Sequence, residues 1–302
     1  MKFIFDIIKG ILIGVANIIP GVSGGTMAVT MGVYDKILDS INNLIKDFKK
    51  SFLTLLPLGI GMVAGIGVFS FILPHCLSNY SFQTSMCFAG LIVGGIPSIF
   101  TSLQDSFDKE KRTKVNPLHI ISFLIFLGIA VFMALANPSS TTADAIEISP
   151  VMVLLLLLMG ILCAAAMVVP GISGSLLLMM LGYYSGIMGT ISKFISALKD
   201  LNGEALLRCI VILAPFGIGC IIGVLMISKL ISWLLKNHES ITYCGIFGLI
   251  AASPFAILCK MENPQYTPVT VTVAIVLFIA GFVFTYMFER ITSKLNTDKE
   301  NK

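Results

Sequence analysis

Charged residues are scarce in this sequence. Of its 302 residues, 12% are Asp, Glu, Lys or Arg and 56% are hydrophobic, with a mean hydropathy of +0.96. Soluble domains carry about 25% charged residues. The longest uncharged stretch, residues 148–192, contains 45 residues, whereas a membrane-spanning helix needs only about 20. These shortages exclude a soluble globular protein and indicate a polytopic membrane protein.

Other signals are missing as well. The alternating ten-residue segments of a β-barrel are absent, so we expect helical spans, which satisfy their own backbone polar groups. The seven cysteines are scattered singly with no C-x-x-C pair, which argues against a disulfide framework and a zinc site. We therefore expect no cofactor and no metal. The net charge of +4 gives no sign of a nucleic-acid partner.

The sequence contains an internal duplication. At an offset of 150, residues 10–37 and 160–187 share 11 identical positions of 28. The shared core is Pro20-Gly21-Val22-Ser23-Gly24-Gly25 against Pro170-Gly171-Ile172-Ser173-Gly174-Ser175. Further along, at an offset of 158, Pro57, Gly59, Gly61 and Gly65 match Pro215, Gly217, Gly219 and Gly223. We expect one integral-membrane domain, residues 1–302, with repeat one at about 1–137 and repeat two at about 148–292.

Each repeat begins with an apolar segment that is broken at the Pro-Gly motif. Three apolar spans follow in each repeat, at 52–74, 82–104 and 118–136, then at 209–228, 242–259 and 268–288. The six spans contain no Asp, Glu, Lys or Arg, which argues against an acidic proton relay through the core.

Lysine and arginine placement indicates the topology, because cytoplasmic loops are enriched in these residues. If each broken segment enters and leaves on one side, 16 of the 20 basic residues lie inside, together with both termini. If each segment crosses once, only 8 do. Three crossings per half make the repeats inverted. Residues 3–17 would form about 22 Å of helix, short of a hydrocarbon core of about 30 Å. We therefore predict an all-α fold with two inverted repeats, each a re-entrant broken helix hairpin plus three transmembrane helices.

The broken segments are predicted to hold an anion. Inverted repeats with helices broken near the midplane are typical of secondary transporters, which bind substrate at the repeat interface. Ser23 and Ser173 are suited to cap the helices that follow, whose first N–H groups favour anions. The competing interpretation is that P-G-x-S-G only allows close helix packing. Arg208 is a further candidate contact, although it could instead pair with Glu204 one turn away. The candidate substrate-binding residues are Pro20, Gly21, Ser23, Gly24, Gly25, Thr26, Pro170, Gly171, Ser173, Gly174, Ser175 and Arg208.

These motifs resemble those of a known family. Residues 14–26, followed by Gly32-Val33-Tyr34, are similar to the signature of the bacterial polyprenyl-phosphate transporters, formerly a domain of unknown function (DUF-368). Residues 170–175 with Gly182-Tyr183-Tyr184 resemble the second motif of that family. The resemblance covers nearly the whole chain. The halves differ at Gly25 against Ser175 and at Thr26 against Leu176, so the two loops need not contribute equally.

The resemblance implies a multi-pass flippase of the bacterial cell membrane and not an enzyme. It would return undecaprenyl phosphate from the outer to the inner leaflet for cell-wall synthesis, with the motif residues around the phosphate. Its partners would be this polyprenyl phosphate lipid and membrane lipids. The sequence does not fix the energy source, and a coupling ion could be either a proton or sodium.

Three alternatives stay open. One is a carrier of a small soluble anion, and another is a scaffold without transport. The third is an undecaprenyl-pyrophosphate phosphatase, but Gly174 and Ser175 occupy the place where such an enzyme would need an Arg.

Overall fold

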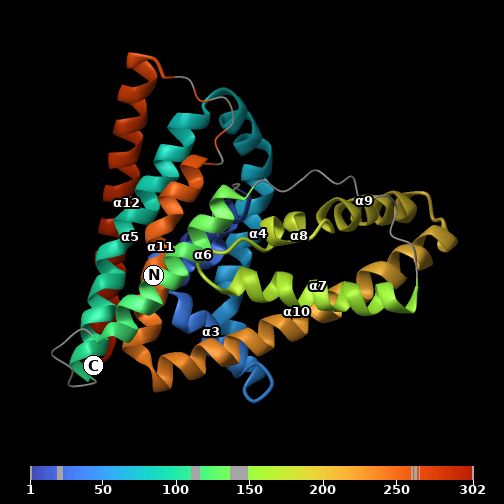
Figure 1. Cartoon of the computed structure of the whole chain (residues 1–302), viewed down its shortest axis with the longest axis horizontal. Helices are drawn as coiled ribbons and strands as arrows, with labels where there is room; N and C mark the ends of the chain where they lie inside the picture. The colour runs from blue at the N-terminus through green and yellow to red at the C-terminus, as the bar shows by residue number, and fades with distance from the viewer. Residues whose placement is uncertain are drawn as a thin grey trace. The chain divides into compact units, whose positions relative to one another are not determined.

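Long apolar helices make up the structure, as the hydropathy predicts. In the computed structural model, residues 2–18, 23–109, 116–136, 149–259, 261, 264 and 266–300 are described, and every regular element among them is a helix (Figure 1). The helices are α1 (Lys2–Ile18), α2 (Gly24–Thr30), α3 (Tyr34–Asn42), α4 (Phe48–Asn79), α5 (Ser81–Lys109), α6 (Pro117–Leu135), α7 (Pro150–Val168), α8 (Gly174–Met180), α9 (Tyr184–Lys199), α10 (Gly203–Asn237), α11 (Glu239–Cys259) and α12 (Pro268–Glu300). The all-α, polytopic fold class is confirmed.

Seven of the described helices are long and apolar enough to cross a membrane. They are α4, α5, α6, α7, α10, α11 and the part of α12 from Pro268 to Ile291. Six of them contain the six predicted spans. The seventh, α7, is the first part of the second broken segment and has 19 residues, about 28 Å of helix. The re-entrant course of the broken segments and the inverted orientation of the repeats stay predictions.

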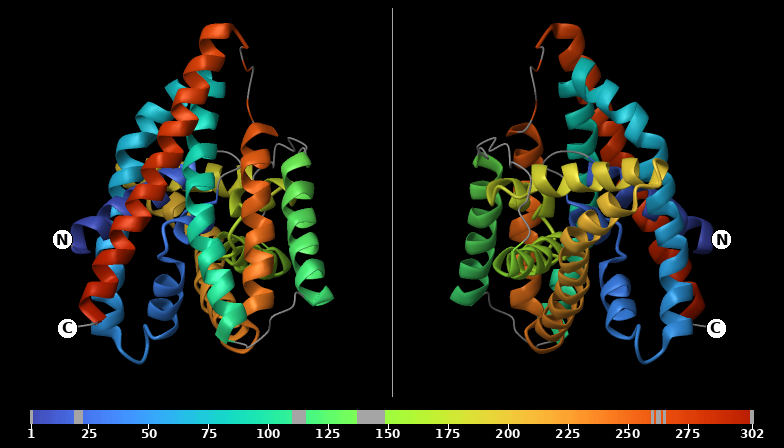
Figure 2. Two further views of the ribbon diagram at one scale, coloured as in Figure 1. Left: turned by 90° about the vertical axis from the view of Figure 1, so that its left-hand side faces the viewer. Right: turned by 90° about the vertical axis from the view of Figure 1, so that its right-hand side faces the viewer.

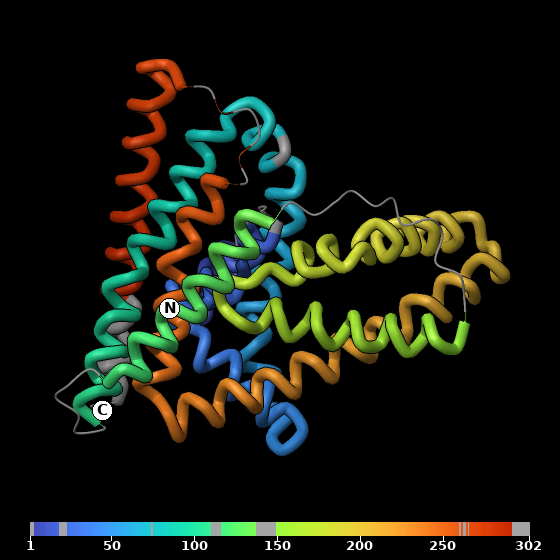
Figure 3. Tube along the Cα trace, viewed as in Figure 1, coloured from blue at the N-terminus to red at the C-terminus, as the bar shows by residue number. Residues whose placement is uncertain are grey.

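The chain forms two compact units, which we describe separately. The first comprises Met1–Leu135, Pro170–Ile172 and Ile231–Lys302, and the second comprises Ala136–Val169 and Ser173–Leu230. In the first unit, α12 runs beside α5 and α11 runs beside α6 (Figure 2). In the second unit, α7 folds back into α8 as a hairpin (Figure 3), and α8 meets α9 at a bend of 112°.

Glycine contacts show that the duplicated sequence produces duplicated packing. A Cβ on Gly61 of α4 would overlap the carbonyl oxygen of Ile7 on α1, and a Cβ on Gly219 of α10 would overlap that of Leu157 on α7. The same holds for Gly65 with Ile11 and for Gly223 with Ile161. In each pair of contacts the glycines are 158 positions apart and their partners are 150 positions apart, which are the two offsets of the duplication. Glycine is required here because the two helix backbones touch.

The short helices end in the same way in both repeats. Gly32 follows α2 with φ +59°, and Gly182 follows α8 with φ +79°, a left-handed conformation that favours glycine. The next residue donates back into the last turn in each case, Val33 N to Ala28 O and Tyr183 N to Leu178 O, both at 3.0 Å. The chain therefore turns sharply after each seven-residue helix.

We predict that Gly61→Ala and Gly219→Ala each destabilise the protein by about 1–3 kcal/mol, because the added methyl group forces touching backbones apart. Gly59 and Gly217 are the matched controls, since they lie two residues earlier and a Cβ there meets nothing within 4 Å. Alanine at those positions should be neutral or stabilising by up to about 1 kcal/mol. Thermal unfolding of the purified protein in detergent measures all four, and equal midpoints would contradict the packing described.

Candidate functional site

Ser23 stands at the start of α2, where the first broken segment resumes. Its backbone is extended, at φ −106° and ψ 133°, and its side chain is 6% exposed. The N-cap position is as predicted, but the hydroxyl makes no capping bond. Within the part of the chain that the structure describes, no group hydrogen-bonds to Ser23 Oγ. A buried hydroxyl without a partner is costly, so this atom is suited to receive a ligand.

An amide side chain lies beside this serine. A Cβ on Gly24 would lie 2.5 Å from both the Oδ1 and the Nδ2 atoms of Asn17, so glycine makes room for the amide. Asn17 is exposed, and its Nδ2 donates to Ile13 O at 3.1 Å, which leaves a second N–H. The sequence analysis omitted Asn17 from the site. The sequence offers one signal for it: Asn17 is a polar residue near the end of an apolar segment, and the equivalent residue of repeat two is the apolar Met167.

Three residues of the second motif, Pro170–Ile172, belong to the first unit, and one of them contacts α2. Gly171 N donates to Thr26 Oγ1 at 2.7 Å, and Thr26 is fully buried. Gly171 has φ +78° and packs against Leu249 of α11. The structure thus brings Ser23, Gly24, Gly25, Thr26, Pro170 and Gly171 into one unit. Thr26 Oγ1 thus accepts a bond from the second loop, and its predicted contact with substrate stays a prediction. Pro20 and Gly21 lie outside the described residues.

The rest of the second motif lies in the second unit and is arranged differently. Ser173 is the predicted N-cap of α8, and its Oγ accepts from Leu176 N at 3.4 Å. Its hydroxyl also bonds that of Ser175 at 3.0 Å. Gly174 packs against Cys163 and Met167. The hydroxyls of Ser173 and Ser175 therefore satisfy each other, in contrast to that of Ser23.

Arg208 occupies a different part of the second unit. It is exposed on α10 and lines a cavity of about 770 Å³ with Ser192, Lys193 and Glu204, among other residues of α9 and α10. Ser173, Gly174 and Ser175 do not line that cavity. No ion pair joins Arg208 to Glu204 in the described structure. Its predicted contact with the phosphate stays a prediction.

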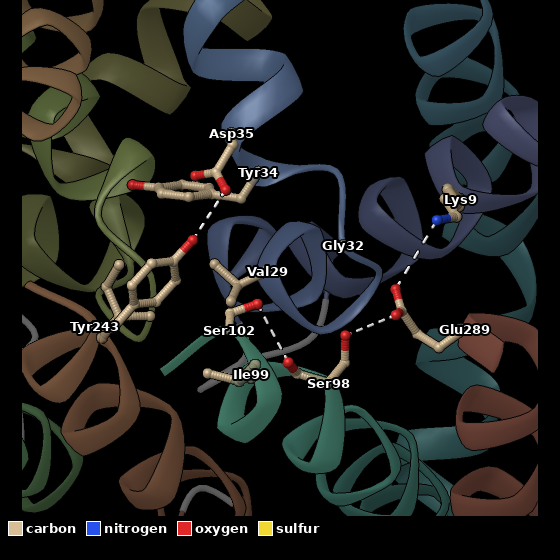
Figure 4. A pocket seen from close by; sticks show the side chains of 11 residues that line it. Lys9, Val29, Gly32, Tyr34, Asp35, Ser98, Ile99, Ser102, Tyr243 and Glu289 are labelled. Carbon is tan, nitrogen blue, oxygen red and sulfur yellow. Dashed lines mark hydrogen bonds and ion pairs between the residues drawn. The ribbon is translucent and has the colours of Figure 1, made fainter. Parts of the chain in front are cut away.

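A charged cavity of about 240 Å³ lies in the first unit (Figure 4). Lys9 of α1 and Glu289 of α12 face each other in it, with 3.9 Å between Nζ and Oε1. They are only 5% and 9% exposed. Lys9 Nζ also donates to Met31 O at 2.5 Å, and Ser98 Oγ donates to Glu289 Oε2 at 2.8 Å. The buried pair of Lys9 and Glu289 is thus hydrogen-bonded to the backbone oxygen of Met31, the residue that follows α2.

Asp35 forms the opposite side of this cavity. The hydroxyl of Tyr243 donates to its Oδ2 at 3.1 Å. Asp35 keeps contact with solvent at the rim, yet the surrounding protein displaces enough water to raise its pKa above the ordinary 3.8. The hydrogen bond from Tyr243 opposes this increase. Burial also raises the pKa of Tyr34, so its phenol stays neutral.

Comparison with known proteins identifies the family. The model of the undecaprenyl phosphate translocase-like (VCA0040-like) family matches residues 13–267. The chain belongs to this family. The polyprenyl-phosphate transporter of Staphylococcus aureus (strain NCTC 8325 / PS 47) is 30% identical over 291 residues, which cover 96% of this chain and 97% of that protein. The polyprenyl-phosphate transporter of Vibrio cholerae serotype O1 (strain ATCC 39315 / El Tor Inaba N16961) is 29% identical over 265 residues, covering 83% and 76%. No solved structure matches the chain.

The charged cavity corrects one expectation for this translocase-like protein. An ionisable-free core was expected because the last predicted span ends at residue 288. The helix α12 continues to Glu300, and the next residue, Glu289, is buried by α1 and α5. Hydropathy places a boundary at the first charge, whereas burial depends on the neighbouring helices. Among the described residues no cluster of His, Cys, Asp and Glu suits a metal ion.

We predict that Asp35→Asn changes how the stability of this translocase-like protein depends on pH. The folded protein binds the Asp35 proton more tightly than the unfolded chain does. The wild type therefore loses stability as pH rises above 3.8 through the raised pKa. The Asn variant lacks this loss, so its advantage over wild type grows across that window and is absent below it. Unfolding midpoints at several pH values measure the difference, and parallel curves would contradict the raised pKa. Tyr243→Phe should extend the wild-type loss to higher pH.

Proposed function

We propose that this protein translocates polyprenyl phosphate, returning undecaprenyl phosphate from the outer to the inner leaflet of the bacterial cell membrane for cell-wall synthesis. The family and the names of both relatives support the lipid-phosphate substrate. The observation that carries the proposal is the buried Ser23 hydroxyl, which has no partner among the described residues and lies at a helix break. A phosphate oxygen would supply the missing bond.

The chemistry of this loop suits an anionic head group. The Ser23 hydroxyl and the remaining N–H of Asn17 are donors, and the first N–H groups of a helix have no partner within it. Because α2 has only seven residues, its dipole is small and these donors carry most of the stabilisation. A bare charge in hydrocarbon is heavily penalised, so a polar binding point lowers the barrier to head-group crossing. The polyprenyl tail can stay in lipid throughout.

The function is tested in liposomes that contain the purified protein and a short-chain polyprenyl phosphate. A membrane-impermeant phosphatase added outside reports how fast inner-leaflet lipid becomes accessible. We expect faster access than in protein-free liposomes. Release of phosphate from the corresponding pyrophosphate without added enzyme would indicate a phosphatase instead. Uptake of inorganic phosphate without lipid translocation would indicate a carrier of small anions.

We predict that Ser23→Ala lowers the translocation rate at limiting substrate by about ten- to hundred-fold. This is the effect of losing one hydrogen bond to a charged group, about 1.5–3 kcal/mol. Ser173→Ala should have a smaller effect, because its hydroxyl is already bonded to Ser175 and Leu176. Ser70→Ala, on the exposed surface of α4, is the matched control and should leave the rate unchanged. A well-folded Ser23→Ala protein with the wild-type rate would remove this hydroxyl from the site.

A further inference from the structure

Lys9 and Glu289 are an expensive pair to bury in a membrane protein. Removing two charges from water costs several kcal/mol per ion, and the mutual attraction does not reliably compensate for it. Ionisable residues inside a membrane domain usually mark a pathway for ions or protons. The question is whether the fold needs this pair for packing.

The equivalent positions of α7 in repeat two show that the helix packing of α1 does not require these charges. At the offset of 150, Met159 takes the place of Lys9, and Leu156 takes that of Asp6. Both belong to an apolar core cluster in the second unit, together with Leu178 and Ile187. In repeat one, Asp6 instead forms an ion pair with Lys36 at 2.6 Å.

The position of Glu289 has an apolar counterpart as well. Gly90 of α5 packs on Phe278 of α12, and Gly248 of α11 packs on Phe123 of α6. Phe278 and Phe123 make equivalent contacts and are 155 positions apart in the sequence. By the same offset, the residue of α6 that is equivalent to Glu289 of α12 is Ala134, which is buried. The counterpart of Lys9 is thus a buried Met in the second unit, and the counterpart of Glu289 is a buried Ala in the first unit. Lys9 lies in repeat one and Glu289 in repeat two, and at each position the other repeat has a buried apolar residue instead, so the duplicated helix packing does not require either charge.

Polar groups line the cavity from Glu289 to its mouth at Asp35 (Figure 4). Ser98 donates to Glu289, and Ser102 Oγ donates to the backbone oxygen of Ser98 at 3.2 Å. Tyr243, which lines the same cavity, donates to Asp35 at 3.1 Å. The cavity of about 240 Å³ has room for several water molecules at about 30 Å³ each. Protons can move through water in this cavity between the carboxylates of Glu289 and Asp35.

The mouth of this path is acidic. A second cavity of about 400 Å³ shares Asp35 and Tyr243 with the first and adds Asp39, Lys236 and Glu239, among others. Lys109 pairs with Glu239 there at 2.8 Å. The count of basic residues predicts that Lys36, Lys109 and Lys236 are cytoplasmic. The path from Glu289 therefore opens toward the side that we predict to be cytoplasmic.

We propose that Glu289, paired with Lys9, binds and releases the proton that drives lipid-phosphate translocation; this inference rests on the proposed function. In the step itself a proton passes from water to the Glu289 carboxylate and later returns to water. The ionisable groups that line the cavity with Glu289 are Lys9 of α1, Tyr34 and Asp35 of α3, and Tyr243 of α11, while α5 contributes the hydroxyls of Ser98 and Ser102. A sodium ion is disfavoured, because the Lys9 ammonium already lies beside the carboxylate.

The geometry also links this proton site to the lipid site. Lys9 holds Met31 O, directly after the last residue of α2, and Ser23 precedes the first residue of the same helix. Protonation of Glu289 removes its attraction for Lys9 and leaves the bond from Lys9 to Met31. The charge state of Glu289 thereby acts on one end of the seven-residue helix whose other end carries the proposed phosphate contact.

The test uses the full chain in liposomes with polyprenyl phosphate, with equal pH on both sides or with a pH gradient of either sign. For the wild type we expect the translocation rate to change at least about threefold with the gradient. An internal pH-sensitive dye should report proton movement that requires the lipid. Glu289→Gln should show no gradient dependence and no dye signal. The same is expected of the double variant Lys9→Met/Glu289→Ala, which has at each position the residue found at the equivalent position of the other repeat. Asp108→Asn, at an exposed carboxylate of α5, is the control and should behave as wild type.

The possible outcomes separate the two proposals. A wild type that translocates lipid at the same rate with and without the gradient overturns the proton site and leaves the proposed function standing. So does a rate that follows a sodium gradient instead. A wild type that moves no lipid overturns both. The double variant should unfold at or above the wild-type temperature, since it removes buried charges, and Glu289→Gln carries the test should the double variant fail to fold.

Discussion

An interrupted helix in a lipid environment has to find partners for its free backbone groups, and the rest of this structure depends on that constraint. Lipid offers no hydrogen bonds, so non-helical backbone is tolerated only where protein covers it or where it lines a polar cavity. Here α1 packs closely on the glycines of α4, and Gly171 of the second motif is hydrogen-bonded to Thr26 of α2. What this covering leaves unsatisfied, the hydroxyl of Ser23, is the point at which a ligand is expected.

The two repeats use one backbone plan for different purposes. Their glycine contacts and helix ends correspond position by position, yet repeat one places charges where repeat two places an apolar cluster. Their serines differ in the same sense, because Ser173 is satisfied locally and Ser23 is not. A duplicated gene product in which one half keeps structural packing and the other gains polar groups can bind and release ligands without losing its frame.

Much of the fold was predictable from residue patterns. Hydropathy located six spans correctly, because it is a local signal, and the matched positions of Gly61 and Gly219 indicated the duplication but not the helices on which they pack. The buried state of Lys9 and Glu289 was not predictable, since it depends on α1 and α12 lying together, 280 positions apart in the sequence. Similarly, the motif identified Ser23 but not the different bonding of Ser23 and Ser173. That difference arises from the neighbours that each loop meets in the folded chain.

The most direct measurement is an experimental structure of the protein in lipid nanodiscs with a short-chain polyprenyl phosphate bound. The account predicts phosphate density within hydrogen-bonding distance of Ser23 Oγ and beside Asn17, with the prenyl tail leading into lipid. Phosphate density beside Lys193 and Arg208, with Ser23 bonded to protein instead, would contradict it.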